Sequence, residues 1–135
     1  MEIETYSDLE KNYSEYFDSK TFKRINCGSG WFNIISNLLY TIELYYEHED
    51  EEVRNNKCLI TKIEEKFGCL NIEFIGDSDK IYNNLIQYTM IMSRKICEYC
   101  GKDGTLYCST KSLHWSDKKT LCIPHAVKMK YYSIK

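Results

Sequence analysis

Two short stretches near the C-terminus, Cys97-Glu98-Tyr99-Cys100-Gly101 and Leu121-Cys122-Ile123-Pro124-His125, decide what this part of the chain can fold into. Each holds two metal-ligating residue types separated by two positions. The 21 residues between the pairs are enough for a hairpin and too few for a domain. Three thiolates and one imidazole suit a closed tetrahedral zinc site. The spacing therefore predicts one structural Zn²⁺ per chain, with the ligands Cys97, Cys100, Cys122 and His125.

The residues around the ligands indicate how such a finger would be built. Gly101 allows the positive φ that a tight turn between two thiolates needs. Thr105–Tyr107 and Lys111–Trp115 are expected to pair as a short hairpin, with Lys118-Lys119 in the loop that follows. Pro124 is suited to the first turn of a helix. The order of knuckle, hairpin and helix start is that of a treble-clef finger.

The same ligand set argues against zinc chemistry. Catalytic zinc usually has three protein ligands and an open water position, whereas four ligands here close the shell. The nucleobase-deaminase pattern H-x-E with P-C-x-x-C does not fit the chain. An HNH-type nuclease could use His114, but His125 is taken as a ligand and no Asn follows Asn84. His114-Trp115 is better interpreted as a packing pair, and we expect a non-enzymatic protein.

Length and composition point to one globular domain. The chain has 135 residues, of which 43% are hydrophobic and 28% charged, which is ordinary for a soluble protein. We expect a single domain, 1–135, with a helical core at 1–96 and the zinc finger at 97–135 packed on it. No apolar run reaches the roughly 18 residues of a membrane span, and the acidic N-terminus is unlike a signal peptide. We therefore expect a cytoplasmic protein with no membrane partner.

In a reducing compartment, cysteines that bind no metal are expected to be buried, reduced thiols. These residues are Cys27, Cys58, Cys69 and Cys108. The twelve tyrosines are a second compositional feature. Tyrosine combines apolar area with a hydroxyl group, so it suits the edges of a core and contact surfaces.

Charge is unevenly distributed, although the net charge is only −2. Residues 1–53 have eight more acids than bases, and residues 94–135 have six more bases than acids. Such asymmetry indicates either a finger that binds anions or two halves of the chain that attract each other. The candidate anion or nucleic-acid contacts are Arg94, Lys95, Lys102, Lys111, Lys118, Lys119, Lys128 and Lys130. The candidate acidic partner surface is Glu47, Glu49, Asp50, Glu51 and Glu52.

Periodicity predicts three helices before the finger. Ser7 begins an S-x-x-E capping box that predicts a helix over residues 8–17. The most regular run begins at Trp31 and predicts a helix to about residue 47. Acids oppose the dipole at a helix C-terminus, so residues 47–52 are expected to form a solvated loop. A third helix, capped by Asp77 or Ser78, is expected to lead into the first cysteine pair. Its predicted core face is Ile81, Tyr82, Leu85, Ile86, Met90 and Ile96.

The stretch 57–68 is ambiguous. Leu59, Ile60, Ile63 and Phe67 fit a helix that ends at Gly68, which we favour, but a strand over Cys58–Ile63 is the alternative. Residues 70–75 alternate as a half-buried strand. The sequence thus predicts an α+β chain: a mostly helical core with a short β element and a C-terminal treble-clef-like zinc finger.

Three motifs together give a resemblance to small uncharacterised proteins of phages and bacteria. That group shares G-D-G-W, K-E-K-F-G-x-L and C-E-x-C-G…L-C-x-x-H. Here they read Gly28-Ser29-Gly30-Trp31, Glu64-Glu65-Lys66-Phe67-Gly68-Cys69-Leu70 and the two ligand stretches. Ser29 and Glu64 depart from the pattern. The resemblance implies no activity, but it does imply that the finger and core form one unit in a phage or mobile-element setting.

Three functional hypotheses follow. The first is a zinc-stabilised protein-binding module, such as a phage-encoded inhibitor of a host defence or nucleic-acid enzyme that works in the host cytoplasm. Tyrosine enrichment favours it, because aromatic residues anchor interfaces. The second is a nucleic-acid-binding zinc finger, which the lysines favour and the scarcity of arginine opposes. The third is a toxin-immunity protein, which would also work by binding a protein.

Overall fold

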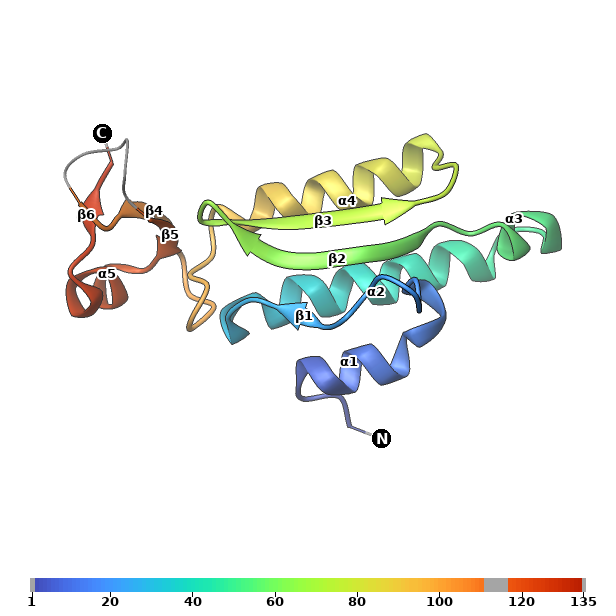
Figure 1. The fold of residues 1–135 in the computed structure, drawn as a ribbon, viewed down its shortest axis with the longest axis horizontal. Coiled ribbons are helices and arrows are strands. Elements are labelled where there is room, and N and C mark those ends of the chain that lie inside the picture. Colours follow the sequence, from blue (N-terminus) through green and yellow to red (C-terminus); the bar gives the residue numbers. More distant parts are fainter. Residues whose placement is uncertain (1, 111–116, 135) are drawn as a thin grey trace.

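The computed structural model describes residues 2–110 and 117–134 and shows an α+β chain with two separate three-stranded sheets (Figure 1). The helices are α1 (Tyr6–Asn12), α2 (Phe32–Glu47), α3 (Glu51–Asn55), α4 (Lys80–Ser93) and α5 (Ile123–Met129). Short 3₁₀ turns occur at Ser14–Tyr16 and Ser29–Trp31. The strands are β1 (Ile25–Asn26), β2 (Leu59–Lys66), β3 (Cys69–Ile75), β4 (Thr105–Cys108), β5 (Lys118–Leu121) and β6 (Tyr132–Ser133).

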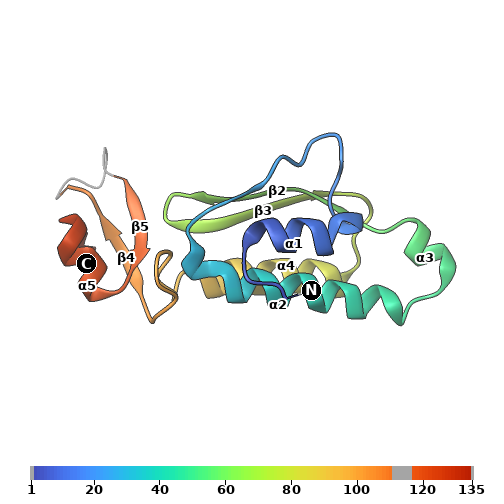
Figure 2. The same cartoon turned by 90° about the horizontal axis from the view of Figure 1, so that it is seen from below.

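The first sheet has the order β1-β2-β3, with β1 parallel to β2 and β2 antiparallel to β3. Helices α2 and α4 cover one face of this sheet, and α1 runs along its β1 edge (Figures 1 and 2). The opposite face is polar: Lys62 on β2 lies 3.9 Å from Glu64 and 4.0 Å from Glu73. The core is therefore a single layer between the sheet and the helices.

Helix α2 supplies the centre of this core. Its expected apolar stripe is confirmed, with Ile35, Leu39 and Ile42 fully buried. Burying each such side chain contributes about 1.5–3 kcal/mol. Trp31, in the turn before the helix, is also fully buried. On the expected face of α4 two residues differ. Ile81 is 55% exposed, because it lies one position before the buried Tyr82, and Ile96 packs on the core from beyond the helix, which ends at Ser93.

The stretch 57–68 contains strand β2, so the favoured helix is wrong and the alternative is right in type, although the strand runs over Leu59–Lys66 and not over Cys58–Ile63. The reason is a register shift between Ile60 and Lys62, where β2 carries an irregularity against β3. A bulge of this kind inserts one extra residue and lets Ile60 and Ile63 both face the core. Apolar residues three positions apart are the spacing of a helix, and the bulge reproduces it in a strand.

Strands β2 and β3 are joined by a two-residue turn, Phe67-Gly68, with φ of 56° and 83°. Positive φ at both positions is the pattern of a type I′ hairpin turn, for which Asn-Gly is preferred. Phe67 therefore occupies a position that its side chain does not favour, and that side chain is 73% exposed. Figure 1 shows this turn at the end of the first sheet that faces the finger.

Three helix starts differ from expectation. The N-cap of α4 is Asp79, which accepts a hydrogen bond from the Tyr82 N–H at 2.9 Å, and not Asp77 or Ser78. The N-cap of α1 is Thr5, which forms a capping box with Asp8, so the helix begins earlier than predicted from Ser7 and ends at Asn12. The acidic stretch does not form only a loop. Asp50 caps α3 by accepting a hydrogen bond from the Val53 N–H at 3.0 Å, and two acids occupy the first turn. Acids there favour a helix, because they face its positive end.

The acidic stretch 47–52 and the finger lie at opposite ends of the molecule. Figure 1 shows α3 at one end of the long axis, with β4, β5 and α5 at the other. In the part of the chain that the structure describes, no helix is long and apolar enough to cross a membrane.

Candidate metal centre

The first cysteine pair sits in a tight knuckle. The Cys97 N–H donates to the Lys102 carbonyl at 2.7 Å, and the Gly101 N–H donates to the Cys97 carbonyl at 3.0 Å. Gly101 has φ of 80°, as expected from its place after the second cysteine. These bonds turn the backbone sharply enough for Cys97 and Cys100 to point to one place.

The second pair lies at the start of α5. Cys122 is the N-cap of this helix, Pro124 lies in its first turn, and the Ala126 N–H donates to the Cys122 carbonyl at 2.9 Å. Proline is tolerated there because its missing N–H would have no partner within the helix. His125 then projects from the same turn and returns toward the Cys122 sulfur. The helix start predicted from the sequence is confirmed.

The four expected ligands converge. Their ligand atoms all lie within 4.8 Å of one another. Nδ1 of His125 lies 3.5 Å from Sγ of Cys97 and 3.1 Å from Sγ of Cys122, and Sγ of Cys100 lies 3.6 Å from Sγ of Cys122. Cys97 and Cys122 are buried, whereas Cys100 is exposed. The cluster could hold one metal ion.

The surroundings of Cys97 favour the thiolate form that a metal needs. Burial raises the pKa of this thiol, but backbone N–H groups of Cys122, Tyr99 and Cys100 lower it, and the net direction is downward. An N–H group stabilises a thiolate because its dipole points at the negative charge. The knuckle backbone therefore prepares this sulfur for a cation.

The knuckle is docked on the first sheet's core by the turn before α2. The Gly30 N–H donates to the Glu98 carbonyl at 2.6 Å, and the Gly28 N–H donates to the Glu98 carboxylate at 2.9 Å. Trp31 Nε1–H donates to the Ile96 carbonyl at 2.9 Å. A Cβ on Gly30 would lie 2.2 Å from the Cys97 carbonyl oxygen. Only glycine permits this close approach of two backbones.

A second contact joins the hairpin turn to β5. Thr120, fully buried, donates its hydroxyl to the Gly68 carbonyl at 2.7 Å. Lys119 Nζ lies 3.8 Å from the Glu65 carboxylate and 3.7 Å from that of Glu98. Burial lowers the pKa of Lys119, but the neighbouring carboxylates raise it, and the net direction is upward. Three sequence segments, 28–31, 64–70 and 97–101, thus meet at one junction.

The hairpin of the finger differs from the prediction in its second strand. The partner of β4 is β5, with Thr105 opposite Leu121 and Cys108 opposite Lys118. Lys118 and Lys119 therefore lie in a strand, not in a loop, because β4 pairs with the residues that lead directly to Cys122. Strand β6 adds to the other edge of β4 and was not predicted. Lys111, His114 and Trp115 lie outside the described residues.

The other candidate contacts are dispersed around the finger. Most are exposed, but Lys119 is held by two carboxylates and Lys118 is half-buried. The exposed ones are Arg94, Lys95, Lys102, Lys128 and Lys130. Among the acids, Asp50 has a structural role as the cap of α3, and Glu47 and Glu51 are exposed. The other two, Glu49 and Glu52, line a pocket at that end of the molecule.

The four cysteines outside the cluster are not all buried. Cys58 and Cys108 are, as expected, whereas Cys27 and Cys69 are half-buried. Burial raises the pKa of Cys27 to about 11, which keeps it a neutral thiol at neutral pH. Sequence reasoning missed the role of Glu98, which is only 4% exposed. A carboxylate between two ligand cysteines was the one available signal.

Comparison with known proteins gives no relative: no protein-family model, no curated protein and no solved structure matches this chain. Function has to be argued from the residues themselves.

Proposed function

We propose that this chain is a zinc-stabilised, non-enzymatic module that acts by binding another protein. The ligand chemistry supports zinc. With Zn–S bonds of about 2.3 Å and Zn–N bonds of about 2.1 Å, a tetrahedral site has edges of about 3.6–3.8 Å. Nδ1 of His125 lies 3.5 Å from Sγ of Cys97, and Sγ of Cys100 lies 3.6 Å from Sγ of Cys122, which is close to those edges; the 3.1 Å between Sγ of Cys122 and Nδ1 of His125 is shorter. The knuckle, hairpin and helix start then form a treble-clef-like finger.

The complete ligand shell supports a structural role for the zinc. Four protein ligands leave no position for the water that catalytic zinc activates. Glu98, the carboxylate nearest in sequence, is engaged by the Gly28 N–H and by Lys119. The zinc therefore fixes the finger against the junction with the core, and the surface beside that junction is what the module presents.

The exposure and backbone conformation of Phe67 are the main support for protein binding. This residue is 73% exposed and has φ of 56°. A bulky residue in the left-handed region costs on the order of 1 kcal/mol, and a phenyl ring that is mostly exposed offsets little of this cost through burial. Strained residues of this kind occur where another molecule is met. The ring stands at the β2–β3 turn, directly beside the strand that leads to Cys122.

Replacement of Phe67 separates binding from folding. Phe67→Asn puts a favoured residue into the type I′ turn, so we expect the free energy of unfolding to rise by about 1 kcal/mol. The native chain and the Phe67→Asn variant are each used as bait to capture the protein partner from the native host, and the captured partner is quantified by mass spectrometry. We expect the variant, although it is more stable, to recover at least about fivefold less partner, because it has lost one aromatic anchor.

Equal recovery with Phe67→Asn would contradict a contact through this ring. Ser29→Ala is the matched control, because Ser29 is exposed on the neighbouring turn. The identity of the Phe67-dependent partner also separates two finer roles. A host defence or nucleic-acid enzyme would indicate an inhibitor of the kind that phages encode, and a toxin would indicate an immunity protein.

Nucleic-acid binding is the second candidate, because five exposed cations surround the finger. Its test is the affinity for single- and double-stranded DNA and RNA across a salt series. Binding through phosphates weakens as salt rises: the logarithm of the association constant falls with the logarithm of the salt concentration, with a slope of about 0.9 for each phosphate contact. Lys102→Gln with Lys128→Gln should then reduce the slope by about 2, while the exposed pair Lys20→Gln with Lys23→Gln should not. Absence of binding at low salt would remove this candidate.

A further inference from the structure

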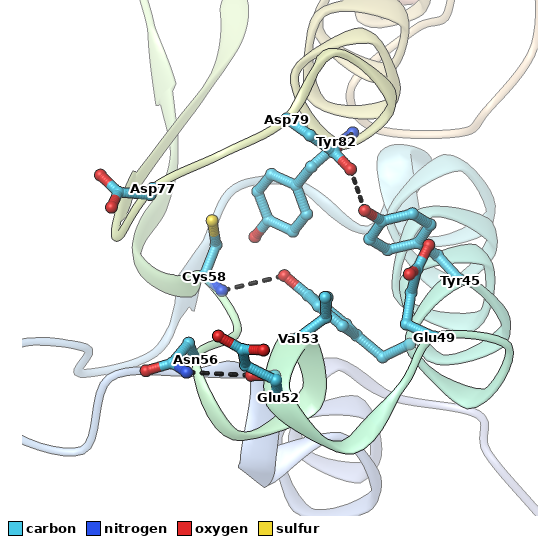
Figure 3. Close-up of a pocket in the computed structure, with 10 residues that line it drawn as sticks. Tyr45, Glu49, Glu52, Val53, Asn56, Cys58, Asp77, Asp79 and Tyr82 are labelled. Atoms are coloured by element: carbon cyan, nitrogen blue, oxygen red, sulfur yellow. Dashed lines mark hydrogen bonds between the residues drawn. The ribbon is translucent and has the colours of Figure 1, made fainter.

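A second site lies at the end of the molecule opposite the finger. A cavity of about 310 Å³ opens between the end of α2, helix α3 and the connection from β3 to α4 (Figure 3). Its size is that of a small-ligand pocket. The described residues that line it include three tyrosines and four acids, and none of them is Lys, Arg or His.

Three aromatic rings form the inner wall of this cavity. The rings of Tyr45 and Tyr46 have centroids 5.0 Å apart at 62°, and those of Tyr46 and Tyr82 lie 6.3 Å apart at 49°. Tyr46 is held from behind by stacking on Tyr16 and by the hydrogen bond that its hydroxyl accepts from the Cys58 N–H at 2.9 Å. Rings fixed at steep angles to one another are the arrangement of an aromatic cage, which attracts organic cations through its electron-rich faces.

Four acids line the cavity, and in Figure 3 the carboxylate of one of them, Asp77, points away from the rings. Glu49 follows α2, Glu52 lies on α3, and Asp77 and Asp79 lie in the connection to α4 (Figure 3). Asp79 accepts hydrogen bonds from the Tyr45 hydroxyl and from the Tyr82 N–H. The Tyr45 bond, and then the backbone bond, lower the pKa of Asp79, so this carboxylate is an anion at neutral pH. The electrostatic potential in the cavity is therefore negative.

The hydroxyl of Tyr82 is the independent sign of a ligand. Tyr82 is only 1% exposed, and its hydroxyl finds no hydrogen-bond partner within the described part of the chain. Figure 3 shows this hydroxyl directed into the pocket, between Cys58 and the ring whose hydroxyl accepts from the Cys58 N–H. A buried polar group without a partner is costly, so a ligand N–H donated to this oxygen would remove a penalty of the folded state.

A metal ion is a poorer occupant than an organic cation. Among residues 2–110 and 117–134, the cysteine and histidine cluster of the finger is the one group of three or more ligand residues placed closely enough for a metal. The pocket carboxylates are spread around the cavity instead. A group wider than a metal ion, with a positive head and an alkyl stem, matches both the spread acids and the aromatic wall.

We propose that this pocket binds an alkylammonium group, with the cation against the rings of Tyr45, Tyr46 and Tyr82 and among the carboxylates of Glu49 and Glu52. One of its N–H groups donates to the Tyr82 hydroxyl oxygen. The lysine side chain of a protein and a free polyamine share this chemistry. The site is remote from Phe67 and from the metal cluster, so it does not rest on the function proposed above.

The test is a titration of the full chain, loaded with zinc, with n-butylammonium chloride at constant ionic strength. Binding is followed by amide chemical shifts in two-dimensional NMR spectra, with n-butanol as the neutral isostere. We expect saturable shifts around Tyr45, Glu52 and Tyr82, with a dissociation constant on the order of 1 mM, and none with n-butanol. The absence of saturable shifts, equal shifts with n-butanol, or shifts centred elsewhere would each overturn the proposal.

Two adjacent acids on α3 supply a matched pair of variants. Both are exposed, but only Glu52 lines the pocket. Both lie in the first turn of α3 and lose the same charge on change to Gln. We expect Glu52→Gln to raise the dissociation constant about threefold or more and Glu51→Gln to leave it nearly unchanged. If both variants raise the dissociation constant equally, the cation is attracted by the general negative charge of this end of the molecule and not by the pocket, and the proposal is overturned.

Tyr82→Phe tests the hydroxyl without emptying the core. Because the hydroxyl has no partner among the described residues, its loss should leave the fold intact, as circular dichroism and the NMR spectrum report. We expect weaker n-butylammonium binding by this variant, and unchanged binding would overturn the role given to Tyr82. Titrations with spermidine and with Nα-acetyl-lysine methylamide then distinguish the two natural sources, because the tighter ligand identifies which one the pocket fits.

Discussion

The backbone N–H of Gly30 donates a hydrogen bond of 2.6 Å to the carbonyl of Glu98, and so joins the core to the metal-binding knuckle. The two residues lie far apart in the sequence and adjoin different hydrophobic clusters: Trp31, next to Gly30, belongs to the cluster around the first sheet, and Cys97, next to Glu98, belongs to the cluster of the finger. Because Glu98 lies between two ligand cysteines, the position of the metal centre depends on this turn. The first three predictions concern this junction.

Gly30→Ala should destabilise the junction. The new Cβ would lie 2.2 Å from the Cys97 carbonyl oxygen and 2.5 Å from backbone atoms of Glu98. Backbone atoms cannot yield as a flexible side chain does, so we expect a loss of roughly 1–3 kcal/mol in the free energy of unfolding. Chemical denaturation of Gly30→Ala and of the exposed control Ser29→Ala measures it. The control should change stability by less than about 0.5 kcal/mol, and a Gly30→Ala protein as stable as the control would contradict the contact.

Metal removal should unfold the finger. Structural zinc contributes about 10–16 kcal/mol to the folding of small finger peptides, which is as much as a whole domain's stability. We expect elemental analysis to find one zinc per chain and chelation to abolish the dispersed NMR signals of residues 97–110 and 117–130.

Cysteine variants provide the control for that experiment. Cys100→Ser should lose the zinc, whereas Cys69→Ser, which changes a half-buried thiol outside the cluster, should keep it. A purified, untagged protein without zinc, or one that is indifferent to chelation, would rule the site out.

Lys119→Met should cost about 2–4 kcal/mol, because it leaves the buried Glu98 carboxylate without its cation. Glu98→Gln removes the charge itself, so the double variant should recover part of the loss. A double-mutant cycle of unfolding free energies isolates this coupling. Lys102→Met is the control, since Lys102 is exposed in the same finger. Additive effects of the two substitutions would contradict a direct interaction.

Tyr45→Phe should make the free energy of unfolding depend less on pH in the acid range. The Tyr45 hydroxyl lowers the pKa of Asp79 below its ordinary value of 3.8. A carboxyl whose pKa falls on folding stabilises the native state above its unfolded pKa and loses that contribution as the pH falls through the folded pKa. We expect Tyr45→Phe to be less stable than the native chain by a constant amount from about pH 7 to 5, with the gap closing from about pH 4 to 2.

Tyr40→Phe is the control for that pH series, because Tyr40 is a half-exposed tyrosine on the same helix. Denaturation curves at each pH should give it no gap that changes with pH. If the gap for Tyr45→Phe stays open at pH 2, the stabilisation of this carboxylate by Tyr45 is wrong.

The sequence by itself determined the features that depend on neighbouring residues. The ligand spacing placed Cys97, Cys100, Cys122 and His125 in one cluster, because each pair needs only a local turn. The 3.6-residue period of α2 and the alternation of β3 were readable for the same reason: each pattern reports one exposed and one buried face.

Tertiary structure alone decided the rest. The bulge at Ile60–Lys62 gave β2 a helical spacing, and only pairing with β3 shows that it is a strand. β4 pairs with β5 rather than with the residues expected, because the strand must lead directly to Cys122. The docking of Gly30 on Glu98 and the cage around Tyr82 bring together residues that no local pattern links. Such contacts depend on complementary shape and hydrogen bonding between residues that are distant in the chain. They therefore produce no periodic pattern in the sequence.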